Sequence, residues 1–78
     1  MKELIEYIAR SLVDNPTQVR VTQIHRGMET NFKLHVAKED MGRVIGRGGR
    51  VANSIRLLLN VAASRANRQA SLDIEEPR

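Results

Sequence analysis

The stretch GRVIGRGGRVANSIRLLL, residues 42–59, decides how this chain is interpreted. Its first nine residues contain four glycines and three arginines, and the rest has the apolar spacing of an amphipathic helix. Glycine has no Cβ, so the main chain bends sharply there and a ligand can approach it closely. The chain therefore places its most flexible and most basic residues where a helix begins.

Excess positive charge is confined to the same part of the chain. The 78 residues include 13 Lys and Arg and 9 Asp and Glu, giving a net charge of +4. Residues 1–40 contain six basic and six acidic side chains, whereas residues 41–72 contain six arginines and no acid. A solvated helix face usually mixes both signs, so this distribution indicates an anionic partner. Arginine rather than lysine favours planar, bidentate contacts with phosphate.

Length and composition narrow the class of protein. A chain of 78 residues is expected to form one domain over residues 1–78. The absence of cysteine excludes disulfides and thiolate metal sites, and suits a cytoplasmic location. His25 and His35 lack a neighbouring carboxylate cluster, so no metal or other cofactor is expected. No segment approaches the ~20 apolar residues of a membrane span, and we expect a soluble protein.

Apolar spacing predicts the order of the elements. Helical spacing predicts helices at residues 2–14 and 50–67, and alternation predicts strands at residues 17–26, 31–37 and 71–75. A turn at residues 27–29 joins the first two strands as a hairpin, and Asp40 is expected to cap a short helical turn at residues 43–45. Ile24 breaks the alternation, so a bulge or strand end is expected near it. Pro77 is predicted to end the fold.

The resulting order is helix, strand, strand, helix, helix, strand. Three helices on one side of a three-stranded sheet bury all the apolar faces, which predicts a two-layer α+β domain.

Two phosphate-binding glycine motifs do not fit the stretch. A Walker-type loop requires a Gly-Lys-Ser or Gly-Lys-Thr ending, and neither occurs here. The dinucleotide fingerprint requires a third glycine three residues after Gly48, where this chain has Val51, and it also requires a βαβ unit. What fits is a Gly-x-x-Gly turn between two helices, at residues 46–49.

The turn and its surroundings resemble the KH domain. The matching residues are Val44 and Ile45 before the turn, Gly46 and Gly49 within it, and Arg50, Val51 and Ile55 after it. The αββααβ order matches the type II, bacterial form of that fold, and a chain consisting of one such domain is similar to the small bacterial RNA-binding proteins of the KhpA family. Gly48 departs from the pattern, because KH loops often carry lysine or another polar residue there. Arg47 is therefore the only charged side chain inside the turn.

The resemblance implies a clamp for single-stranded RNA, used by an RNA chaperone or post-transcriptional regulator. A phosphate would approach the bare main chain at the start of a helix, while arginines hold the neighbouring phosphates. The expected RNA-binding residues are Arg43, Val44, Ile45, Gly46, Arg47, Gly48, Gly49, Arg50 and Val51. Bases would lie in an apolar groove walled by Val44, Ile45 and Val51 and facing the edge of the strand of Leu34 and Val36, two residues also expected in the core.

Two alternatives remain open. The KH fold could serve mainly to dock another protein, and the resemblance implies a homodimer or a pair with a larger KH-containing protein. That contact is expected around Val61, Ala62 and Ser64, although the alanines there would also suit internal packing. Single-stranded DNA is the other alternative, since no residue visibly reads a 2′-hydroxyl. No nucleophile can be matched to a base, so no enzymatic activity is expected.

Overall fold

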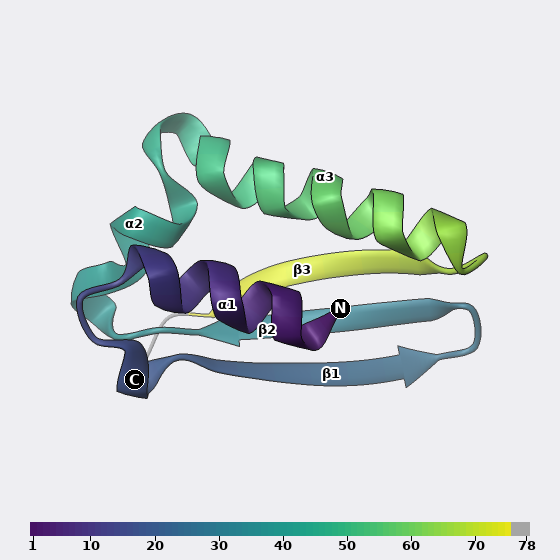
Figure 1. The fold of residues 1–78 in the computed structure, drawn as a ribbon, viewed down its shortest axis with the longest axis horizontal. Helices are drawn as coiled ribbons and strands as arrows, with labels where there is room; N and C mark the ends of the chain where they lie inside the picture. Colours follow the sequence, from purple (N-terminus) through teal and green to yellow (C-terminus); the bar gives the residue numbers. More distant parts are fainter. Residues whose placement is uncertain (76–78) are drawn as a thin grey trace.

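Three helices and a three-stranded sheet form two layers (Figure 1). The computed structural model describes residues 1–75, and Pro77 lies outside the described residues. The element order confirms the predicted α+β architecture. The elements are α1 (Lys2–Leu12), β1 (Arg20–Arg26), β2 (Glu29–His35), α2 (Met41–Ile45), α3 (Arg50–Arg65) and β3 (Gln69–Glu75), with 3₁₀ turns at Pro16–Gln18, Lys38–Asp40 and Arg47–Gly49.

The end of α3 has a local cause. The N–H of Arg68 donates to the carbonyl of Ala63 at 2.8 Å, and the N–H of Asn67 donates to that of Ser64 at 3.1 Å. Asn67 has a φ of 55°, so residues 63–68 form a Schellman motif with asparagine in the left-handed position. The helix therefore ends two residues before the predicted boundary, and β3 starts directly after the motif.

The strand order is β1-β2-β3, so β2 is the central strand. β1 pairs with β2 in antiparallel fashion and β3 pairs with it in parallel, each over seven residues. The β1 register is continuous from Arg20 opposite His35 to Arg26 opposite Glu29, so no bulge occurs near Ile24, and the strand ends two residues after it. Among residues 1–75, the sheet has two free edges, one along β1 and one along β3.

The helices cover one face of the sheet and bury the core there (Figure 1). Alternate residues of β2 are buried, as period-two alternation predicts. They pack with residues of all three helices, and Leu34 and Val36 lie in the core as expected. The largest apolar core side chains are Phe32, Ile5, Leu34, Leu59 and Val44. No helix within residues 1–75 is both long and apolar enough to cross a membrane.

Candidate nucleic-acid interface

The Gly-x-x-Gly turn lies between α2 and α3, at the end of the domain farthest from the β1–β2 hairpin turn (Figure 1). Gly46, Gly48 and Gly49 have φ values of 75°, 61° and 78°. Residues with a side chain rarely adopt these values, so this main-chain path requires glycine at three of its four positions. The N–H of Gly49 donates to the carbonyl of Gly46 at 3.2 Å, which closes the turn.

The first and third residues of the turn need glycine for different reasons. A Cβ on Gly46 would lie 2.6 Å from Cγ2 and 2.9 Å from the main-chain nitrogen of Val51, so Gly46 is packed against α3. A Cβ on Gly48 would meet no atom within 4 Å, and Gly48 is exposed. Gly46 thus fixes the turn to the helix, while Gly48 leaves its main chain open to a ligand.

The turn leads directly into the first turn of α3. Gly49 is the N-cap residue, and no side chain caps this helix. The first amides of a helix lack intrahelical acceptors, and the helix dipole favours negative charge at that end. A phosphate beside Gly48 would therefore meet both open main chain and a favourable helix terminus.

The three arginines around the turn differ in their partners. Arg47 and Arg50 are exposed and form no ion pair within residues 1–75. Arg43 instead places Nη2 2.9 Å from Oδ2 of Asp14 and Nε 3.8 Å from Oδ1 of Asp40. Two guanidinium groups are thus available to an anion, and the third is partly neutralised by carboxylates.

Asp40 positions α2 but does not cap it. Its carboxylate is buried and accepts hydrogen bonds from the main-chain N–H groups of Asp14 at 3.0 Å and Asn15 at 3.1 Å. No side-chain hydrogen bond caps α2, so the predicted capping role is wrong. Asp40 joins the segment after α1 to the start of α2, the helix that ends at the Gly-x-x-Gly turn.

The apolar residues near the turn do not form the predicted groove. Val44 is completely buried, so its side chain has no surface to offer a base. Ile45 and Val51 are half-buried and pack against the core. The exposed part of Val51 lines an apolar hollow with Ile8 and Leu58, between α1 and α3. A wall along the edge of β2 is also wrong, because this central strand has no free edge.

The flank of α3 that approaches β3 is polar, and the sequence analysis missed it. Nε of Arg56 donates to the carbonyl of Leu72 at 3.2 Å, and Nη1 donates to Oδ1 of Asn53 at 3.1 Å. Asn60 and Ser64 follow at helical spacing on the same flank. The spacing is visible in the sequence, but only the strand order shows that this flank faces a free edge of the sheet.

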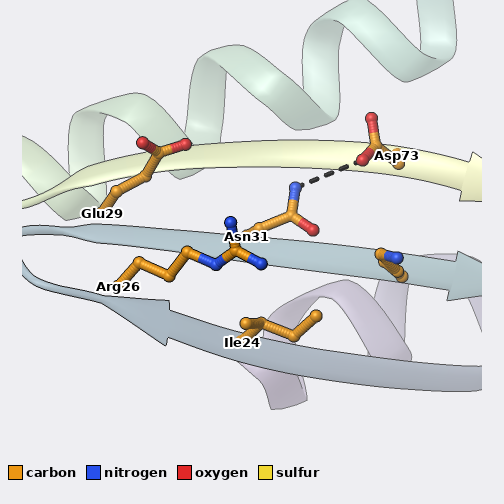
Figure 2. Close-up of a pocket in the computed structure, with 6 residues that line it drawn as sticks. Ile24, Arg26, Glu29, Asn31 and Asp73 are labelled. Atoms are coloured by element: carbon orange, nitrogen blue, oxygen red, sulfur yellow. Dashed lines mark hydrogen bonds between the residues drawn. The ribbon is translucent and has the colours of Figure 1, made fainter.

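The open face of the sheet carries charges of both signs (Figure 2). A shallow hollow of about 310 Å³ lies there, lined by residues of all three strands that include Arg26, Glu29 and Asp73. The amide of Asn31 donates to Asp73 at 3.3 Å, and Lys33 pairs with Glu75 at 3.4 Å. These carboxylates would repel a phosphate, so the open face is a poor surface for nucleic acid.

The αββααβ order and the Gly-x-x-Gly turn between α2 and α3 together define a type II KH domain. The sequence profile described as KhpA/KhpB, KH domain matches residues 2–74. The chain belongs to this KhpA/KhpB family of KH domains.

Several curated relatives are similar over nearly their whole length. The RNA-binding protein KhpA of Caldanaerobacter subterraneus is 45% identical over 74 residues, which cover 95% of this chain and 99% of the relative. The protein of the same name from Clostridium acetobutylicum is 43% identical with the same coverage. That of Chlamydia trachomatis is 42% identical over 78 residues and all of both chains. No solved structure gives a significant match.

Proposed function

We propose that this chain binds single-stranded RNA and holds the strand's backbone at the Gly-x-x-Gly turn. The observation that carries the proposal is the exposed main chain at Gly48. It lies beside Arg47 and Arg50, two arginines that have no ion-pair partner in the described part of the chain. The relatives are named RNA-binding proteins, and this supports RNA over single-stranded DNA.

The nine predicted binding residues divide into two groups under this proposal. Residues 46–50 contact the strand, because they form the turn, its free arginine side chains and the start of α3. Val44, Ile45 and Val51 support the turn from the core side. Arg43 joins the contact when a phosphate competes with Asp14 for its guanidinium.

The proposed role is that of an RNA chaperone or post-transcriptional regulator, and not of an enzyme. A KH loop holds about four backbone nucleotides, and such a clamp keeps a short segment single-stranded without any bond being made or broken. The proposal needs no cofactor.

Gly48 and Gly27 allow a matched test of the clamp. Both are exposed glycines with positive φ, 61° and 58°, and a Cβ on either would meet no atom within 4 Å. Gly27 lies in the β1–β2 hairpin turn at the other end of the domain. We expect Gly48→Asp to lower the affinity for an oligouridine of four nucleotides, which is too short to extend from the turn to the hairpin, by about tenfold, because a carboxylate then faces the phosphate. Gly27→Asp is the control, and equal affinities for the two variants would contradict the proposal that the turn holds the RNA backbone.

A second candidate function, protein docking, is favoured by an apolar surface on α3. Leu57, Leu58 and Val61 are 50–65% exposed, and the hollow between Leu58 and Ile8 is lined mainly by apolar atoms. A contiguous exposed apolar surface on a small domain suits a protein contact. The partner we propose is a second copy of the chain or a larger KH-containing protein.

The structure modifies the expected position of that contact. Val61 is exposed, Ala62 is half-buried and the neighbouring Ala63 is buried in the core, so only part of the alanine-rich segment is accessible. We expect Val61→Glu to lower the weight-average mass measured by sedimentation across concentration. If the wild-type chain sediments as a monomer at every concentration, the proposed self-association is contradicted.

A further inference from the structure

A second polar site lies at the other end of α3 from the Gly-x-x-Gly turn. An open hollow there is lined by Asn60 and Ser64 of α3, by Asn67 and Arg68 of the following turn, by Gln69 and Ala70 of β3, and by Met28 of the β1–β2 hairpin turn. Its lining contains amide and hydroxyl groups, which both donate and accept hydrogen bonds, and no carboxylate. The hollow thus combines hydrogen-bonding capacity with positive charge.

Arg68 supplies that charge in a fixed orientation. Its Nε donates to Oγ1 of Thr30 at 3.2 Å, and Nη2 contacts Nδ1 of His25 at 3.0 Å and the carbonyl of Gly27 at 3.3 Å. These contacts use Nε and Nη2, so Nη1 has no hydrogen-bond partner within residues 1–75. None of the ion pairs in that range involves Arg68. The guanidinium is therefore held in place without being neutralised.

The polar flank of α3 connects this hollow to the turn. Asn53, Arg56, Asn60 and Ser64 follow one another along the side of the helix that approaches β3. α3 has 16 residues, so its two ends are separated by ~24 Å at 1.5 Å per residue. That length corresponds to about seven nucleotides at the ~3.4 Å spacing of a stacked strand, and to fewer when the strand is extended.

We propose that the hollow is a second contact for the same RNA strand, outside the clamp. The amides of Asn60 and Asn67 would pair with the exposed edge of an unstacked base, and Arg68 would contact a phosphate next to it. This inference rests on the proposed function. A protein partner is better suited to the surface of Leu58 and Val61 on another flank of α3, because Met28 is the one large apolar side chain among the described residues that line the hollow.

Asn60→Asp and Gln18→Glu are a matched pair for testing the second contact. Both residues are exposed amides without a side-chain hydrogen bond within residues 1–75, Asn60 on α3 and Gln18 in the 3₁₀ turn before β1, and each substitution changes charge without changing shape. Affinity would be measured for oligouridines of four and twelve nucleotides. A twelve-nucleotide strand contains about nine registers for a four-nucleotide clamp, so a gain above about ninefold requires a further contact.

For the wild-type chain, we expect the affinity for the twelve-nucleotide strand to exceed that for the four-nucleotide strand by more than about ninefold. Asn60→Asp should lower the affinity for the longer strand by about fivefold and leave the affinity for the shorter strand unchanged, while Gln18→Glu should change neither. Asn67→Asp provides the same test from the turn after α3 if Asn60→Asp fails to fold by circular dichroism.

Each other outcome overturns the inference in a distinguishable way. If Asn60→Asp and Gln18→Glu bind the longer strand equally, the hollow is not a contact, while the clamp stands. If Asn60→Asp changes the sedimenting mass but not the affinity, the hollow belongs to a protein interface. If the wild-type chain binds neither strand, the proposed function fails together with this inference.

Discussion

Gly46 lies against the first turn of α3 so closely that a Cβ placed on it would come within 2.6 Å of Cγ2 of Val51. The backbone of Gly46, with φ 75° and ψ 173°, occupies a region that is essentially restricted to glycine. The first glycine of the turn therefore has a structural role in addition to any contact with a ligand.

Gly46→Ala should lower the free energy of unfolding by about 3 kcal/mol, because strain and overlap with Val51 act together. Gly42→Ala is the control, since Gly42 is helical and a Cβ there meets nothing within 4 Å. It should raise the stability by about 0.5–1 kcal/mol. Urea denaturation compares the two variants, and equal stabilities would contradict the close packing at Gly46.

Asp40→Ala should destabilise the domain by about 2–4 kcal/mol. The substitution leaves the N–H groups of Asp14 and Asn15 without their acceptor at a partly buried position. Asp14→Ala removes an exposed carboxylate and should cost less than about 1 kcal/mol. Thermal unfolding of both variants checks the difference, and an Asp40→Ala protein as stable as Asp14→Ala would contradict the anchoring role.

Asp14→Asn should raise the affinity for a short oligouridine by about two- to threefold. The change removes the carboxylate 2.9 Å from Arg43 and frees that guanidinium for a phosphate. The same substitution in an Arg43→Gln background should have no effect on binding. An equal increase in both backgrounds would show that Asp14 acts through overall charge instead of through Arg43.

The salt dependence of binding should report the phosphates held by Arg47 and Arg50. For single strands, the slope of log K against log salt concentration is about −0.7 per neutralised phosphate. Replacing both arginines by glutamine should therefore make the slope shallower by about 1.4. Arg20→Gln with Arg26→Gln removes the same charge from β1 and should leave the slope unchanged. A change of the same size in both double variants would show that the slope depends on the overall charge of the chain and not on phosphate contacts of the arginines at the turn.

The element order was predictable because most apolar residues of this chain follow the period of their own element. The exceptions involve contacts between distant segments. Asp40 has the sequence position of a helix cap, but its carboxylate bonds to main-chain groups 25 and 26 residues earlier. Ile24 suggested a bulge because it is an apolar residue on the open face of the sheet, where it lines the hollow in Figure 2.

The turn was predictable and its surroundings were not. Residues 46–50 could be identified because the glycine spacing and the nearby arginines are local features of the sequence. The groove depended on strand order, which apolar spacing does not specify. With β2 in the centre, the edge that α3 approaches belongs to β3, and Val51 faces the hollow toward α1. Asn53 and Arg56 therefore line the side of α3 that approaches the edge of the sheet, where an apolar groove was predicted.

A titration of the isotope-labelled chain with unlabelled oligouridine, followed through its amide resonances, tests the clamp most directly. The account predicts that the amide signals of Gly46 to Val51 move progressively and saturate together, and that those of the open sheet face do not move. The clamp is contradicted if the signals of the turn stay in place while those of another surface respond to the added strand.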